Sequence, residues 1–286
     1  MKAGVIGLGA MGAPIAINLH RAGLLAAIWN RSAERCQPVT EQTGIMPAQD
    51  LPSVARECDV VILSVSADSD VLDVIRQLQP GCHEGMVVID TSTVSAATAR
   101  QAASILAEQQ VGFIDAPVSG GVEGARNAKL SIMAGGDSQV LDRVRPVLEA
   151  ISARIVHLGP TGSGQATKAV NQIMIAGINE AVTEALAFAQ AMDLPLSHVI
   201  EAVGGGAAGN WFLSHRGQTM VAGSYDPGFR IALHDKDLGI CQSMAAEQGV
   251  ELPLVEITRA HYHALIEQGF GDDDISGLFR LKRAER

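Results

Sequence analysis

Gly7-Leu8-Gly9-Ala10-Met11-Gly12 decides how the first part of this chain folds. A short apolar run at residues 3–6 precedes it, and apolar residues at helical spacing follow at 15–19. A strand, a Gly-x-Gly-x-x-Gly turn and a helix form the arrangement that binds dinucleotides. Gly7 permits the tight turn, Gly9 lets a pyrophosphate approach the backbone, and Gly12 lets helix and strand pack closely. The N–H groups at the start of the helix then favour phosphate.

Strand and helix patterns alternate through the rest of the first half. We expect strands at 25–29, 60–65, 86–89, 113–114, 130–134 and 154–158, and helices at 36–43, 71–78, 96–109 and 139–151. This alternation predicts an α/β fold with a mostly parallel sheet and helices on both faces. Ligands of such sheets bind beyond the carboxyl ends of the strands. Ser64, Val65 and Thr93 are therefore expected on the cofactor side.

The segment Asn30-Arg31-Ser32 follows the second expected strand. A site selective for NAD usually has Asp or Glu here to bind the ribose 2′-hydroxyl, and this chain has neither. An amide, a guanidinium and a hydroxyl suit a 2′-phosphate instead. NADP is therefore favoured as the cofactor and NAD stays possible. The alternative is that Arg31 is only a solvated charge.

Two further stretches contain candidate site residues. Ser119-Gly120-Gly121 follows an expected strand and offers two N–H groups and a hydroxyl, which suits a carboxylate. Lys168 lies in the first turn of a long apolar helix expected from residue 166 to about 191. An unpaired buried ammonium is costly, so this lysine is a candidate for chemistry. The alternative is a solvated charge at the end of a helix.

Composition limits the classes of partner. The chain has 286 residues, 47% of them hydrophobic, and a formal net charge of −10. This acidic balance without a basic cluster argues against nucleic acid. The four cysteines form no CxxC pair, so neither a disulfide framework nor a metal site is expected. Glycines interrupt the N-terminal apolar run, and the most apolar window, 170–192, contains two glutamates. We therefore expect a cytoplasmic protein with no membrane partner.

The second half is expected to be helical. Further helices are predicted from about residue 195, at 238–248 and at 254–268. The run Asp272-Asp273-Asp274 is expected to be a solvated turn. Apolar residues on more than one helix face predict a homo-oligomer, either a homodimer or a homotetramer.

Four separated motifs have a common resemblance. They are GLGAMGAPIAINL at 7–19, DAPVSGG at 115–121, GSGQATKAVNQ at 162–172 and HDKDL at 234–238. Together they resemble the β-hydroxyacid dehydrogenase family, which includes 3-hydroxyisobutyrate dehydrogenase, tartronate semialdehyde reductase and the glyoxylate/succinic semialdehyde reductases. The motifs occur in the family's order and span nearly the whole chain.

The resemblance implies a Rossmann-like NADP-binding domain at 1–162 and an all-helical substrate and oligomerisation domain at 163–286. It implies Lys168 as the catalytic proton donor and acceptor, with Thr93 and Ser119 near the nicotinamide and the substrate carboxylate. Phe229 and Asp237 match substrate-side positions, and Lys236 matches a position that closes over the cofactor.

Gln172 is a departure from the family pattern, which often has Asn four residues after the lysine. Asn171 stands one residue earlier. Both amides lie roughly on the lysine's side of the helix, so either could hold a substrate hydroxyl. This Asn-Gln pair and the segment PGFR at 227–230 resemble tartronate semialdehyde reductases, which favours small semialdehydes without selecting one.

We therefore expect an NADP-preferring oxidoreductase that interconverts a small semialdehyde acid and its hydroxy acid. The substrates in view are tartronate semialdehyde, glyoxylate, and succinic or methylmalonate semialdehyde. One alternative is an imine reductase-like enzyme, although those usually replace the lysine with Asp or Tyr. The other is a cofactor-binding protein without catalysis, although relatives of that kind have lost the lysine.

Overall fold

The computed structural model describes residues 1–283. Contacts divide the chain into two compact units, Met1–Lys168 and a second that begins at Ala169. The helix α8 (Ser163–Ala191) is continuous and belongs to both. Each unit has its own hydrophobic core.

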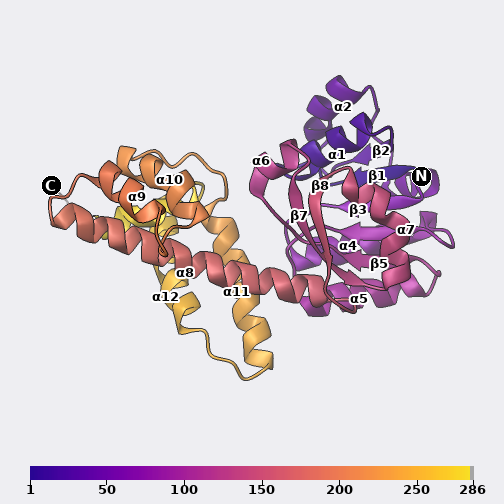
Figure 1. The fold of residues 1–286 in the computed structure, drawn as a ribbon. Helices are drawn as coiled ribbons and strands as arrows, with labels where there is room; N and C mark the ends of the chain where they lie inside the picture. Colours follow the sequence, from indigo (N-terminus) through magenta and orange to yellow (C-terminus); the bar gives the residue numbers. More distant parts are fainter. Residues whose placement is uncertain (284–286) are drawn as a thin grey trace. The chain divides into compact units, whose positions relative to one another are not determined.

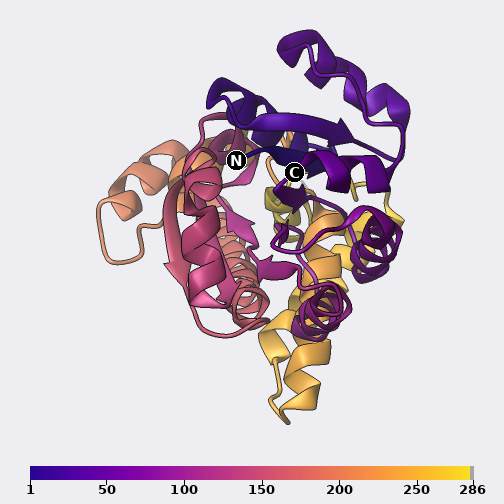
Figure 2. The same cartoon turned by 90° about the vertical axis from the view of Figure 1, so that its right-hand side faces the viewer.

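The first unit is an eight-stranded sheet with helices on both faces (Figures 1 and 2). The strands are β1 (Ala3–Ile6), β2 (Leu25–Trp29), β3 (Val60–Leu63), β4 (Val87–Asp90), β5 (Gly112–Asp115), β6 (Val118–Ser119), β7 (Leu130–Gly136) and β8 (Ser152–His157). The helices are α1 (Gly12–Arg21), α2 (Gln37–Thr43), α3 (Leu51–Glu57), α4 (Asp68–Leu78), α5 (Ala96–Ala107), α6 (Gly121–Arg126) and α7 (Ser138–Glu149), with 3₁₀ turns η1 (Ala33–Cys36) and η2 (Gln79–Gly81).

The strand order is β2-β1-β3-β4-β5-β7-β6, and β8 pairs with β7. Strands β1 to β5 are mutually parallel, whereas β7 is antiparallel to β5. The predicted mostly parallel sheet is confirmed. Because β2 and β3 flank β1 on opposite sides, the chain changes direction there, which is where ligands bind in open α/β sheets.

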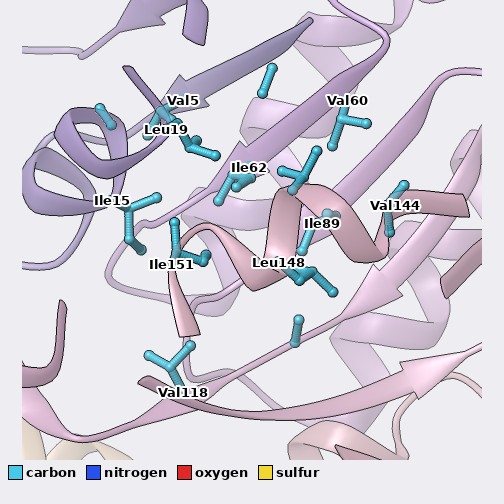
Figure 3. Packing of buried hydrophobic residues seen from close by; sticks show 14 of the residues in the cluster. Val5, Ile15, Leu19, Val60, Ile62, Ile89, Val118, Val144, Leu148 and Ile151 are labelled. Atoms are coloured by element: carbon cyan, nitrogen blue, oxygen red, sulfur yellow. The ribbon is translucent and has the colours of Figure 1, made fainter. Parts of the chain in front are cut away.

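Alternate residues of the central strands face opposite layers. In β3, Val60 and Ile62 belong to the cluster that packs against α1 and α7, while Val61 and Leu63 face α3, α4 and α5. Figure 3 shows the first cluster, in which strand and helix side chains point toward one another. Burial on both faces explains why these strands read as continuous apolar runs.

The second unit is helical, as predicted. After α8 it contains α9 (Leu196–Gly204), α10 (Trp211–Ala222), α11 (Ile231–Glu247), α12 (Pro253–Glu267), the 3₁₀ turn η3 (Ile275–Leu278) and α13 (Phe279–Lys282). No helix in the described part of the chain is long and apolar enough to cross a membrane.

The expected helix boundaries in the second unit were partly wrong. Helix α11 begins at Ile231, whereas the sequence pattern predicted a start at residue 238. Its first two turns contain His234 and Asp237, which are polar and yet buried. A buried polar pair interrupts the apolar spacing from which amphipathic helices are read. Helix α10, which Asn210 caps by accepting from the Leu213 N–H, was also missed.

Candidate active site

The glycine-rich turn between β1 and α1 is closely packed against β3. A Cβ on Gly7 would lie 2.2 Å from the Ser64 carbonyl oxygen, and the φ of 92° at Gly7 favours glycine. A Cβ on Gly12 would lie 1.8 Å from the Gly7 carbonyl oxygen. Close packing inside the protein therefore requires glycine at both positions.

At Gly9, packing inside the protein does not require glycine. A Cβ there would meet nothing nearer than the Arg35 guanidinium nitrogen Nη1, at 3.8 Å. Met11, the residue before α1, makes no side-chain hydrogen bond to the helix start. A glycine without a packing requirement beside an uncapped helix N-terminus fits a dinucleotide pyrophosphate. Arg35 is a cation at this turn that the sequence reasoning missed; its only signal was a basic residue four positions after Arg31.

Asn30 has a structural part in the same turn. Its Oδ1 accepts from the Leu8 N–H at 2.8 Å, and its Nδ2 donates to the Ser32 carbonyl oxygen at 2.9 Å. Arg31 is different, because its side chain is 84% exposed and its Nη1 lies 3.2 Å from Asp70 Oδ1. Asn30 thus shapes the turn, and the Arg31 guanidinium is accessible from solvent.

The carboxyl ends of β3 and β4 are linked beside this turn. Ser64 donates its N–H to the Ile6 carbonyl oxygen at 2.9 Å. Val65 donates its N–H to Ser92 Oγ at 2.9 Å. These bonds place Ser64 and Val65 at the end of β1 and connect them to the loop that contains Thr93.

Asp115 anchors the start of α8. Its Oδ1 accepts from the Gly162 N–H at 2.8 Å, and its Oδ2 accepts from the Gln165 N–H at 2.9 Å. Between them, a Cβ on Gly164 would lie 2.4 Å from the Met133 carbonyl oxygen. A buried carboxylate and a glycine therefore hold the first turn of α8 against the sheet.

Gln165 connects the same helix to the loop after β4. Its Oε1 accepts from the Val94 N–H at 3.2 Å, and its Nε2 donates to the Ser92 carbonyl oxygen at 2.8 Å. The side chain is buried, and Thr93 lies between its two partners in the sequence. One amide thus fixes the backbone on both sides of Thr93.

Lys168, one turn later, lies against the Ser-Gly-Gly turn. Its Nζ donates to the Val118 carbonyl oxygen at 2.9 Å, and the residue is 8% exposed. Ser119 follows directly, and Gly120 and Gly121 have φ values of 122° and 61°, which favour glycine. The structure therefore brings Lys168 to the turn that was predicted to hold a carboxylate.

Two buried carboxyl groups support this region. Asp90 and Asp115 are register partners at the ends of β4 and β5. Burial raises the pKa of Asp90 to about 7, hydrogen bonds from Ser92 oppose the shift, and the charges of Asp115 and Asp68 add to it. Burial also raises the pKa of Asp115, against the lowering effect of the backbone N–H groups it accepts from. Oδ2 of Asp90 has no hydrogen-bond partner among residues 1–283.

The second unit places four of the predicted residues in one chain of contacts. Asn171 Nδ2 donates to Gln172 Oε1 at 2.8 Å, and Gln172 Nε2 donates to Asp237 Oδ2 at 2.7 Å. Asp237 Oδ1 lies 2.8 Å from the Lys236 ammonium. Gln172 is fully buried, whereas Asn171 is half-buried.

His234, which sequence reasoning did not single out, is fully buried beside this chain of contacts. Its Nε2 lies 3.2 Å from the Gln172 carbonyl oxygen, and its Nδ1 lies 2.9 Å from Tyr262 Oη. Asn179 Nδ2 donates to the same hydroxyl at 3.0 Å. The Phe229 ring packs 5.2 Å from the imidazole, centroid to centroid.

Asp274 positions the segment that contains Phe229. Its Oδ2 accepts from the N–H groups of Gly228 and Phe229 at 2.9 and 3.0 Å, and Arg216 Nε lies 3.3 Å from its Oδ1. The residue is 1% exposed, so the expected solvated turn is wrong for Asp274. Three adjacent aspartates do not reveal which one points inward.

Two family models match the chain. Residues 2–159 match the NAD binding domain of 6-phosphogluconate dehydrogenase, and residues 162–282 match the NAD-binding domain of NADP-dependent 3-hydroxyisobutyrate dehydrogenase. The chain belongs to the β-hydroxyacid dehydrogenase family. It is therefore an NAD(P)-dependent oxidoreductase with a Rossmann-like domain and a helical C-terminal domain.

Relatives resemble this dehydrogenase over almost their whole length. An uncharacterised oxidoreductase of Shewanella frigidimarina is 39% identical over 99% of both chains. The 2-hydroxy-3-oxopropionate reductase of Escherichia coli is 34% identical over 97% of this chain and 96% of its own. A solved structure of Mycobacterium tuberculosis 3-hydroxyisobutyrate dehydrogenase with L-serine superposes with a TM-score of 0.90 at 30% identity, over 99% of both chains.

Within the described ranges of the dehydrogenase, no group of three or more His, Cys, Asp or Glu side chains is arranged to hold a metal ion. Two histidines, His261 and His263, lie close together in the sequence. Each imidazole contacts a different carboxylate, Glu180 for His261 and Asp235 for His263.

Proposed function

We propose that this dehydrogenase prefers NADP(H) and interconverts a small semialdehyde acid with its hydroxy acid, with Lys168 as proton donor and acceptor. The observation that carries the proposal is the bond from Lys168 Nζ to the Val118 carbonyl oxygen, directly before Ser119. A lysine at a carboxylate-binding turn is where a substrate acid bound by Ser119, Gly120 and Gly121 would meet a proton donor.

The bound nicotinamide supplies or accepts the hydride. Lys168 donates a proton to the oxygen that becomes the alcohol during reduction and accepts it during oxidation. Burial beside a main-chain acceptor keeps its ammonium in one place, which satisfies the geometric requirement for general acid catalysis. The Thr93 loop, held by Gln165, positions the nicotinamide side of the site, and Asp115 fixes the start of the helix that contains Lys168.

The preference for NADP rests on the cations near the glycine-rich turn. No acidic residue occurs in Asn30-Arg31-Ser32 to bind a ribose hydroxyl. The Arg31–Asp70 pair is exposed, and exposed pairs contribute at most about 1 kcal/mol, so a 2′-phosphate can displace Asp70 at little cost. Arg35 adds a second guanidinium at the same turn. Assays with NADPH and NADH as paired cofactors measure this preference.

We assign the cofactor to residues 1–162, and the substrate and oligomer surfaces to 163–286, of which the last three lie outside the described residues. Large apolar side chains exposed on the second unit, such as Met174 (62%) and Phe188 (66%), support self-association. A homodimer or homotetramer stays a prediction.

Lys168→Ala tests the proposal. We expect kcat for semialdehyde reduction to fall by about 10²–10⁴-fold, because the general acid is lost. The Kd for NADPH, measured by fluorescence titration, should stay within about twofold, because the turn at Gly9 is untouched. Lys2→Ala, an exposed lysine, is the matched control.

Retained turnover in Lys168→Ala would contradict the assignment. Loss of NADPH binding together with turnover would show a structural lysine instead. A panel of tartronate, methylmalonate and succinic semialdehydes and glyoxylate, with cyclic imines as the contrasting class, identifies the substrate. Activity on imines alone would replace the proposal with an imine reductase.

A further inference from the structure

The directions of the amide hydrogen bonds around Asp237 can be derived from chemistry. A carboxylate only accepts hydrogen bonds and an ammonium only donates them. Asp237 Oδ1 faces the Lys236 ammonium at 2.8 Å, and its Oδ2 faces the Gln172 amide at 2.7 Å. The Gln172 atom that faces Asp237 must therefore be its nitrogen. Oxygen and nitrogen of an amide are assigned by such partners, and this one allows a single assignment.

The same logic extends to Asn171. With its nitrogen on Asp237, Gln172 presents Oε1 on the other side, where Asn171 Nδ2 donates at 2.8 Å. Asn171 must then direct Oδ1 away from Gln172. One carboxylate therefore sets the orientation of two successive amides. The outermost of them presents an acceptor oxygen.

The backbone under this chain of amides is also held. A carbonyl oxygen only accepts, so His234 Nε2, 3.2 Å from the Gln172 carbonyl, has the proton and donates it. The other ring nitrogen, Nδ1, lies 2.9 Å from the Tyr262 hydroxyl, which accepts from Asn179 Nδ2 at 3.0 Å. All of these hydrogen bonds lie inside the second unit and are buried.

Burial separates the parts played by the two amides. Gln172 is fully buried with both ends of its amide bonded inside the protein. Asn171 is half-buried and lies three residues after Lys168, on the same side of α8. Asn171 is thus the amide that a ligand can reach, and Gln172 positions it.

We propose that Asp237, acting through Gln172, fixes Asn171 as a hydrogen-bond acceptor for a hydroxyl at C2 of the substrate. The site then selects a 2-hydroxy-3-oxo acid over its 2-methyl analogue. A hydroxyl donates to Asn171 Oδ1, whereas a methyl group leaves that oxygen desolvated and unpaired, and sites built for a hydroxyl reject analogues that lack it. This inference rests on the proposed function, and it adds the substrate class and two positioning residues.

The experiment compares kcat/KM for tartronate semialdehyde and methylmalonate semialdehyde, which differ by hydroxyl against methyl at C2. Wild-type enzyme should prefer the hydroxy substrate by on the order of tenfold or more. Asn171→Ala should bring the ratio close to one. Alanine is a good helix former, so α8 should persist in this variant.

Asp237→Asn tests the control of orientation directly. Lys236 will take the carboxamide oxygen, so the new N–H₂ faces Gln172, which must turn its oxygen inward and its nitrogen toward Asn171. Asn171 then presents Nδ2 instead of Oδ1, although every amide is still present. The hydroxy/methyl ratio should fall by on the order of tenfold. Asp235→Asn is the matched control, because Asp235 lies on α11 as Asp237 does but pairs with Arg259 of α12.

The outcomes separate the two proposals. If wild-type enzyme reduces no semialdehyde acid of the panel, the proposed function fails. If it reduces only succinic semialdehyde or glyoxylate, that function stands and the substrate class inferred here is overturned. If it reduces the hydroxy and methyl substrates at similar efficiency, or prefers the methyl compound, that function stands and the acceptor role of Asn171 is overturned. If Asp237→Asn lowers both efficiencies equally, the carboxylate is only structural and the control of orientation is overturned. If that variant does not fold, the hydroxy/methyl ratio of Asn171→Ala alone decides whether the enzyme recognises the C2 hydroxyl.

Discussion

Gln165 and Gln172 are two buried glutamines about two turns apart on α8, and they bond to different kinds of partner. Gln165, in the first unit, uses its amide on main-chain groups, the Ser92 carbonyl and the Val94 N–H. Gln172, in the second unit, uses its amide on the side chains of Asp237 and Asn171.

The difference shows two ways to hold a site. The partners of Gln165 are main-chain groups, which are present whatever residues stand at positions 92 and 94. Its contacts therefore depend on how closely α8 approaches that backbone, which glycines such as Gly164 permit. The side-chain partners of Gln172 can be exchanged by mutation, so the second unit can change what it presents while its helices stay in place. We expect the first unit to fix the reaction and the second to tune the substrate.

Two glycine substitutions on α8, one in each unit, should show the largest difference between the units, in the free energy of unfolding. In Gly164→Ala the new Cβ would lie 2.4 Å from the Met133 carbonyl oxygen and 2.6 Å from that of Asp115, and backbone cannot move aside cheaply. We expect a loss of about 3 kcal/mol in the free energy of unfolding.

Gly177→Ala is the matched change in the second unit. Its Cβ would lie 2.9 Å from Leu254 Cδ2, the end of a flexible side chain, and alanine favours the helix by about 1 kcal/mol. Its stability should stay within about 1 kcal/mol of wild type. Urea unfolding of both variants measures the difference, and equal losses would show that the two units are packed alike around α8.

Leucine substitutions of the glutamines should separate the two parts of the site. Gln165→Leu leaves two buried main-chain groups unpaired, so we expect a loss of about 2 kcal/mol in the free energy of unfolding. The KM for NADPH should also rise, because the loop around Thr93 is released. Gln172→Leu should leave that KM unchanged and lower the hydroxy/methyl substrate ratio instead, since Asn171 is then free to rotate.

Gln190 on the same helix is the control for these leucine variants. Its Oε1 is buried without a hydrogen-bond partner in the part of the chain that the structure describes, so leucine there should be neutral or slightly stabilising. Steady-state kinetics and urea unfolding of all three variants check the pattern. The comparison fails if Gln165→Leu and Gln172→Leu change the same kinetic constant.

Asp90→Asn tests whether a buried carboxyl group makes the stability of the first unit depend on pH. Burial raises the pKa of Asp90 from its ordinary 3.8 to about 7, so the folded protein binds this proton more tightly than the unfolded chain does. The stability this gives is present below pH 4 and is lost as the pH rises toward 7. The substitution removes a titrating group and keeps the oxygen that accepts from the Ser92 N–H.

The free energy of unfolding of wild type, relative to that of Asp90→Asn, should fall by about 1 kcal/mol per pH unit between pH 4 and 7 and then level off. Urea unfolding at pH 5, 6, 7 and 8 measures this difference. Parallel curves for the two proteins would show that Asp90 keeps its charge throughout.

Much of the first unit was predictable because its signals are local. A tight turn, a close backbone approach and a helix start each demand a residue type at a fixed spacing, as at Gly7 and Gly12. Lys168 stood out because one cation interrupts an apolar helix. Arg35 was missed because its only signal is a charge on an exposed turn.

The second unit was less predictable because its important residues are polar and buried. The first two turns of α11 were not predicted as helix, because His234 and Asp237 are buried polar residues that interrupt the apolar periodicity. Asp274 could not be told from its two acidic neighbours, because the inward orientation of a side chain depends on the loop it supports.

By itself, the sequence determined the Rossmann-like sheet and the family, because their signals lie in residues adjacent in the chain. It also predicted the dinucleotide turn and Lys168 as parts of the site. It left Asn171 and Gln172 equivalent, since both lie on the same side of one helix. Only the tertiary structure distinguishes their surroundings, because it brings Asp237 from 65 residues away to the Gln172 amide. A carboxylate that can only accept then determines which atom each amide presents, and that follows from contact in space.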